Sequence, residues 1–145
     1  MNNVSENDLE RFLKAQEYDY ATARWELRNG KKRSHWIWYI FPQLRGLGSS
    51  RYSHYYGISG IEEAKAYLLH PILSERLLKL SEILLSLDET DPVCILGEID
   101  ARKLQSSMTL FSAADPENEV FRAVLTKFYG GETDPVTLRM LNERE

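Results

Sequence analysis

A run of five leucines at alternating spacings of four and three residues is the feature that most constrains the fold. The run begins two residues after Pro71, and proline is favoured at the first position of a helix. Its members are Leu73, Leu77, Leu80, Leu84 and Leu87. Two heptads are too short for a stable isolated coiled coil, so the pattern predicts a central core helix. A seam between two copies of the chain is the alternative.

Helix signals recur before and after this run. Apolar residues at helical spacing predict helices over 8–16 and 19–28. Ser59 followed by Glu62 matches a capping box, in which the serine oxygen accepts from an exposed helix amide and the glutamate reaches back. Asp100 is expected to cap a helix that runs through Phe111.

Aspartate-proline pairs mark three further helix starts, because aspartate accepts from the first amides and proline has no amide to satisfy. These pairs begin at Asp91, Asp115 and Asp134. No segment alternates convincingly like a strand, and no linker divides the 145 residues. The sequence therefore predicts an all-α fold: a single compact domain over 1–145, with seven to nine short helices around a central Leu-rich helix.

The least generic stretch is KKRSHWIWYIFPQLRGLG, residues 31–48. A short helix over 35–41, ended by Pro42, is one interpretation, and a strand with two apolar faces is the other. No acidic residue occurs between Glu26 and Glu62, whereas six lysines and arginines do. The net charge is −4, so the remaining residues carry −10. A basic block in an acidic protein predicts an anionic partner, unless it is only a solvated face.

Side chains suited to ligand binding are concentrated in this stretch. Lys32 and Arg33 could hold a phosphate, and Gln43 could contact an amide or carbonyl. Trp36 and Trp38 could stack on a ring, although core packing is the more ordinary role of tryptophan. Histidine is a common acid-base group in enzymes, which makes His35 a candidate for that role, while a buried structural histidine is the alternative.

A second polar constellation lies in the helix predicted after Asp100. Hydroxyl residues are poor helix formers, so Ser106 and Ser107 in its middle need another reason to be there. Close helix packing is one reason. A polar wall with Lys103, opposite the tryptophans, is the other.

Several chemistries lack their sequence signals. The three histidines have no metal-ligand spacing, and no phosphate loop or serine nucleophile elbow is present, so we predict no metal and no cofactor. Cys94 is the one cysteine and lies among apolar residues, which predicts a buried thiol and a reducing compartment. The polar N-terminus (1–10) and the shortness of the apolar runs predict a soluble, cytoplasmic protein without a membrane span.

The segments KRSHWIWYIFPQLRGLGSS, SGIEEAKAYLLHPILSERL, KLQSSMTLF and FRAVLTKFYGGETDPVTLRML resemble a bacterial family, domain of unknown function 1810. The resemblance covers about residues 8–141. It implies a mainly helical domain, supports a helix over 35–41, and implies no established activity. The label "calpastatin-like", sometimes attached to the family, finds no support here, because calpastatin is long, repetitive and disordered. SHYYGISGIEEAK is also weakly similar to helical ADP-ribose-processing domains.

These observations lead to one leading hypothesis: the chain binds an anionic, ring-bearing small molecule that is nucleotide-like. The site would comprise Lys32, Arg33, His35, Trp36, Trp38, Gln43, Lys103, Ser106 and Ser107. Whether the chain is an enzyme is open, with an ADP-ribose or nucleotide reaction at His35 as one alternative. A protein or nucleic-acid interaction module is the other, although the mild net charge makes nucleic acid an unfavoured partner. A monomer or weak dimer is expected.

Overall fold

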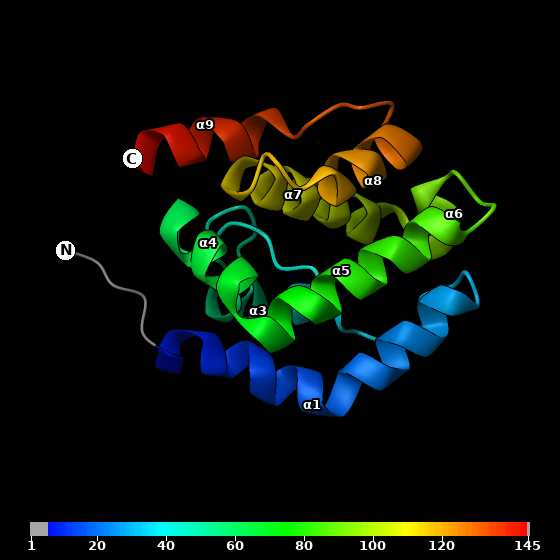
Figure 1. Ribbon diagram of the computed structural model, residues 1–145, viewed down its shortest axis with the longest axis horizontal. Coiled ribbons are helices and arrows are strands. Elements are labelled where there is room, and N and C mark those ends of the chain that lie inside the picture. Colours follow the sequence, from blue (N-terminus) through cyan, green and yellow to red (C-terminus); the bar gives the residue numbers. More distant parts are fainter. Residues whose placement is uncertain (1–5, 145) are drawn as a thin grey trace.

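The computed structural model describes residues 6–144, and these residues form nine α-helices (Figure 1). The helices are α1 (Glu6–Arg28), α2 (Ile37–Ile40), α3 (Arg51–Tyr55), α4 (Ile61–Leu69), α5 (Pro71–Ser86), α6 (Pro92–Leu96), α7 (Glu98–Ala114), α8 (Glu119–Tyr129) and α9 (Pro135–Arg144). The predicted all-α fold is confirmed. The polar segment 1–10 lies partly outside the described residues. None of the helices within 6–144 is both long and apolar enough to span a membrane.

The leucine-rich helix α5 lies at the centre of the molecule. In Figure 1 it lies above α1 and below α7 and α8, and it packs against α1, α4 and α8. Leu73, Leu77, Leu80 and Leu84 are each at most 1% exposed, and Leu87 is partly buried against the same core. The prediction of a core helix is therefore confirmed. These leucines are covered within one chain, so the seam offers no surface to a second copy.

Helix α7 is the other central element, and it packs against α4, α6, α8 and α9. Two of its hydroxyl residues have acceptors for their buried protons: Thr109 donates to the carbonyl of Gln105 (2.8 Å), and the one proton of Ser106 is shared between the carbonyl of Arg102 (3.2 Å) and the carboxylate of Asp134 (2.9 Å). Such bonds to the preceding turn let hydroxyl groups enter an apolar environment. The structure thus shows why poor helix formers are tolerated here.

Several predicted helix boundaries are wrong. Residues 8–16 and 19–28 belong to one helix, α1. Asp19, the first residue of the second predicted helix and a capping residue by type, lies inside α1 and accepts a hydrogen bond from the Tyr39 hydroxyl. Helix α7 begins at Glu98 after Gly97, so Asp100 lies inside the helix. At both sites a tertiary contact takes the carboxylate that local sequence rules assign to a helix end.

The Asp-Pro prediction holds at two of its three positions. Asp91 accepts from the amide of Val93 (2.9 Å) at α6, and Asp134 accepts from that of Val136 (3.2 Å) at α9. Helix α8, in contrast, starts after Asn118, three residues beyond Asp115. The pair at 115–116 lies in the turn before that helix.

Two further local predictions need correction. At the start of α4 the capping residue is Gly60, and Glu63 takes the place predicted for Glu62 by accepting from the amide of Ser59 (2.8 Å). Cys94 is exposed, not buried. It lies on the short helix α6, whose buried side carries Ile95 and Leu96.

Lys127 of α8 ties the end of α5 to its neighbour. Its ammonium donates to the carbonyls of Leu84 (2.9 Å) and Leu85 (3.1 Å), and also to that of Leu87. A cation at a helix C-terminus satisfies exposed carbonyls and interacts favourably with the helix dipole. We expect Lys127→Met to lower the free energy of unfolding by about 1–2 kcal/mol. Urea denaturation should detect this loss, and Lys14→Met, at an exposed position of α1, should stay within about 0.5 kcal/mol of wild type.

Candidate functional site

A buried carboxylate fixes the loop between α1 and α2. Glu26, 4% exposed, accepts three hydrogen bonds on Oε1, from the amides of Arg33 (2.9 Å) and Ser34 (3.0 Å) and from the indole of Trp36 (2.9 Å). Its Oε2 accepts from the Ser34 hydroxyl (2.5 Å). Burial by itself would raise the pKa of Glu26, but these hydrogen bonds stabilise the anion and lower the pKa to about 2. Glu26 is therefore ionised at neutral pH and holds residues 33–36 in place.

This anchoring removes two of the predicted residues from any open site. Trp36 is fully buried, so its ring packs in the core and cannot stack on a ligand. Lys32 is directed inward as well: its side chain is 7% exposed, lies 2.8 Å from a carboxylate oxygen of Asp100, and covers the ring of Trp36. The charge of Lys32 is already compensated by this partner, so the geometry gives no support to the prediction that Lys32 contacts phosphate.

His35 and Arg33 lie on the surface. Both are exposed, and neither lines the cavity and clefts described below. The structure therefore does not bring His35 together with the other predicted site residues, and the prediction that it is buried in the core is wrong too.

Trp38, two residues from Trp36, has a different environment. Its ring is half-buried and stacks on Tyr52 of α3, with 4.9 Å between ring centroids and 29° between the planes. The ammonium of Lys103 on α7 lies 4.9 Å from the centroid of the same ring, at the distance of a cation–π contact. The indole Nε1 is buried and has no hydrogen-bond partner in the described part of the chain.

A small cavity adjoins this group. Its volume is about 10 Å³, which is room for roughly one water molecule. It is lined by Ile37, Trp38, Phe41, Gln43, Tyr52, Ser53, Tyr56, Gly57 and Lys103. The predicted residues Trp38, Gln43 and Lys103 thus come together across the loop after α2, α3 and α7.

A larger cleft of about 440 Å³ lies next to the cavity, because Gln43 and Lys103 line both. Its walls are the loop after α2, helix α7 and the start of α9. The remaining lining residues are Leu47, Gly48, Ile99, Arg102, Gln105, Ser106, Asp134 and Val136. Ser106 donates to Asp134 (2.9 Å), which also accepts from Thr137 (2.6 Å). These bonds hold the acidic wall of the cleft in a fixed position.

Ser107 is fully buried, so the prediction that it faces the ligand is wrong for the structure as it stands. Unlike Ser106 and Thr109, its hydroxyl has no hydrogen-bond partner among the described residues. It lies one helical turn from Lys103. A buried hydroxyl without a partner costs free energy, so this position calls for an explanation beyond packing.

Sequence reasoning missed several residues that shape the site. Tyr52 and Ser53 line the cavity, and Arg102 and Asp134 line the cleft. Gly48 also lines the cleft. A Cβ atom there would lie 2.5 Å from the hydroxyl of Ser53, so the loop can pack this closely on α3 only with glycine. The signal available in the sequence was the density of aromatic residues between Glu26 and Glu62, where no acidic residue occurs.

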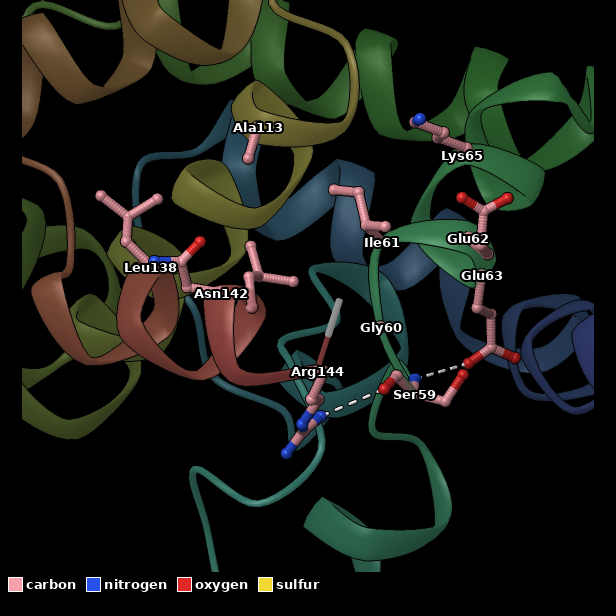
Figure 2. Close-up of a pocket in the computed structure, with 11 residues that line it drawn as sticks. Ser59, Gly60, Ile61, Glu62, Glu63, Lys65, Ala113, Leu138, Asn142 and Arg144 are labelled. Carbon is pink, nitrogen blue, oxygen red and sulfur yellow. Dashed lines mark hydrogen bonds between the residues drawn. The ribbon is translucent and has the colours of Figure 1, made fainter. Parts of the chain in front are cut away.

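Another cleft lies between α4 and α9 and has a volume of about 1070 Å³ (Figure 2). Its polar groups largely bind one another: the Ser59 amide donates to Glu63 (2.8 Å), and Arg144 donates to the Ser59 carbonyl (3.1 Å). Glu62 and Glu63 occupy the first turn of α4, where acidic side chains interact favourably with the helix dipole. The lining sets Lys65 and Arg144 against these two glutamates, so this cleft has no excess of positive charge with which to bind an anion.

No group of three His, Cys, Asp or Glu side chains within residues 6–144 has the arrangement of a metal site.

Comparison with protein families finds that the model for "Protein of unknown function (DUF1810)" matches residues 6–141. Among solved structures, the conserved hypothetical protein Rv1873 from Mycobacterium tuberculosis is 47% identical, with a TM-score of 0.91. The match covers 93% of this chain and 96% of that one. A search of curated proteins gives no match.

Proposed function

The chain belongs to the DUF1810 family, and from the geometry of its site we propose that it binds an anionic, ring-bearing small molecule of nucleotide-like character. The proposed site is the cleft between the loop after α2 and helix α7, together with the small cavity beside it. Trp38, Gln43, Lys103 and Ser106 remain its binding residues, and Tyr52 and Arg102 join them.

The observation that carries this proposal is the state of Lys103. Its acidic neighbour, Asp100, lies 4.0 Å away and is already engaged at 2.8 Å by Lys32. The charge of Lys103 is therefore incompletely paired, although its side chain is only 21% exposed. Arg102 beside it is 75% exposed, and its ion pair with Glu98 is long at 3.7 Å. An anion in the cleft would gain from both cations at little cost in broken contacts.

Size and lining support a ring as the second part of the ligand. A volume of about 440 Å³ lies within the range of small-molecule sites. Leu47, Ile99 and Val136 supply apolar surface, and Ile99 and Val136 are 68% and 38% exposed without a ligand. Tyr52, 55% exposed, lines the adjoining cavity rather than this cleft. Apolar walls with a few polar groups are typical of sites that bind organic molecules.

The alternatives have less support. Catalysis by His35 would need the ligand to reach a residue outside the cleft. A protein-binding face on α1 has one observation in its favour: Tyr18 and Trp25, seven residues apart, are 85% and 63% exposed. A cytoplasmic location and a monomeric or weakly dimeric state stay predictions.

Thermal denaturation with adenosine, AMP, ADP and ADP-ribose tests the proposal. We expect the anionic compounds to raise the melting temperature and adenosine to raise it less. At a ligand concentration of about 100 times Kd, the added stability is about 2.7 kcal/mol. Lys103→Met should weaken binding at least about tenfold, because it removes the partly buried cation. Lys65→Met, which removes an exposed lysine beside the cleft between α4 and α9, should bind as wild type does.

Two results would contradict the proposal. One is that none of the anionic compounds stabilises the protein at millimolar concentration. The other is that Lys103→Met and Lys65→Met respond to every compound alike. A bell-shaped dependence of turnover on pH, abolished in His35→Ala, would instead establish the enzymatic alternative.

A further inference from the structure

The small cavity beside Trp38 is lined by hydrogen-bond donors that lack acceptors. Among the described residues, the indole Nε1 is buried without a hydrogen-bond partner, and the Lys103 ammonium has the 4.0 Å contact with Asp100 and the cation–π contact with Trp38. The side-chain amide of Gln43, 9% exposed as a residue, lines the same cavity. Ser53 accepts from the hydroxyl of Ser50 (2.9 Å), which leaves its own proton available to donate.

The cavity has no opposing carboxylate. None of its lining residues is acidic, and the remaining ones are apolar or aromatic apart from two tyrosine hydroxyls. Asp100 is not among the residues that line the cavity, and it lies 2.8 Å from Lys32. A buried donor without an acceptor costs about 1–3 kcal/mol, so a donor-lined space should contain an acceptor when the protein functions.

Size restricts what that acceptor can be. A cavity of about 10 Å³ admits one water-sized atom and no more. An aromatic ring cannot enter it. The cleft of about 440 Å³, which shares Gln43 and Lys103 with the cavity, is the space large enough for a ring.

We propose that this cavity is an oxyanion site, which receives one oxygen of a carboxylate or phosphate group from the ligand. The Trp38 indole N–H and the Lys103 ammonium are its principal donors, with Gln43 and Ser53 as further donors. The inference rests on the proposed function and deepens it by assigning the ligand an orientation. The anionic group enters between α2 and α3, and the ring remains in the cleft along α7.

Tyr52 is part of the same arrangement. Its ring stacks on Trp38 and is 55% exposed, so it forms the outer wall of the cavity. Tyr52 already covers one face of Trp38, so that face is not open to the ring of the ligand. The role of Trp38 is then to donate a hydrogen bond, and Trp38→Phe should weaken oxyanion binding while leaving the aromatic stack in place.

The indole resonances of the three tryptophans provide a direct test. Trp25 is exposed, Trp36 donates to Glu26, and Trp38 has no acceptor. Proton–nitrogen spectra of ¹⁵N-labelled protein, assigned with single Trp→Phe variants, can follow each indole N–H during titration with sodium acetate, sodium phosphate or sodium chloride. We expect the Trp38 proton to move downfield and saturate with acetate or phosphate, while those of Trp25 and Trp36 follow the chloride control.

If acetate saturates the shift of the Trp38 resonance at a lower concentration than phosphate does, the ligand carries a carboxylate. The opposite order indicates a phosphate. Lys103→Met should weaken the response at least about tenfold, and Lys65→Met should leave it unchanged. The inference is overturned if Trp38 moves no more than in chloride, or if Lys103→Met responds as wild type does.

The NMR titration and the thermal denaturation can fail independently of each other, so they test the oxyanion site and the proposed function separately. Saturation by acetate or phosphate without stabilisation by any ring compound would leave the oxyanion site standing and remove the ring-bearing ligand. Stabilisation by a ring compound with an unmoved Trp38 resonance would leave the ring-bearing ligand standing and remove the oxyanion site.

Discussion

Replacing Glu26 by glutamine should lower the free energy of unfolding by about 3 kcal/mol at pH 7. The variant keeps the shape of the side chain and removes the charge that the amides of Arg33 and Ser34 and the indole of Trp36 stabilise. The ordinary pKa of 4.5 falls to about 2 in the folded chain. Because one pKa unit corresponds to about 1.4 kcal/mol, this difference amounts to about 3 kcal/mol.

The sign of the pH dependence follows from the lowered pKa. The unfolded chain binds a proton at Glu26 more readily than the folded chain does, so the contribution of Glu26 to stability is fully present above about pH 4.5. It is lost as the pH falls from about 4.5 to about 2. Glu26→Gln has no proton to bind at this position, and its stability should therefore lack that part of the acid dependence.

Urea denaturation of wild type and Glu26→Gln at pH 7 and at pH 3 measures both effects. The difference between the two proteins should be large at pH 7 and smaller at pH 3. Glu17→Gln, at an exposed position of the same helix, should follow wild type at both pH values. A constant difference between wild type and Glu26→Gln across this range would show that the charge of Glu26 is not what stabilises the loop.

Removal of Arg11 should destabilise the fold by about 3–5 kcal/mol. The guanidinium of Arg11 on α1 donates to both carboxylate oxygens of Glu63 on α4, at 3.0 and 3.2 Å. It also donates to the carbonyls of Tyr55 (2.8 Å) and Gly57 (3.0 Å). The two side chains are 10% and 4% exposed, so Arg11→Met would leave the Glu63 carboxylate buried without its cation.

An exposed pair of the same kind provides the matched control. Arg102 and Glu98 lie 3.7 Å apart on α7, and both side chains are 75% exposed. Glu98→Gln should change the free energy of unfolding by no more than about 0.5 kcal/mol, because solvent screens the pair. If Arg11→Met costs no more than Glu98→Gln in the same denaturation assay, the buried pair does not hold α1 to α4. The double variant Arg11→Met with Glu63→Gln should recover part of the loss.

The predictions that succeeded rest on local rules. The leucine spacing identified α5, and the capping residues Asp91 and Asp134 identified the starts of α6 and α9. Those rules depend on residues within one or two turns of one another, so the sequence contains all the information that they need. They failed at Asp19, where the carboxylate binds Tyr39 from a distant helix.

In the candidate site, too, the structure agrees with the expectation from the sequence at some residues and differs from it at others. Lys103, Gln43 and Trp38 were predicted to lie together, and the structure places all three around one cavity. Lys32 and Trp36 were expected beside them and are instead part of the buried framework. Sequence reasoning could not separate the two tryptophans, because each lies in the same apolar run with a basic residue nearby.

The sequence by itself determined the helical class, the central leucine-rich helix and the basic, aromatic stretch 31–48. Only the tertiary structure decided which side chains of that stretch are available to a ligand. The reason is competition for two carboxylates. Glu26 takes the indole of Trp36, and Asp100 is closest to Lys32, so Trp38 and Lys103 are left beside the cavity with incomplete partners. That outcome depends on distances between α1, α2 and α7, which the order of residues along the chain does not specify.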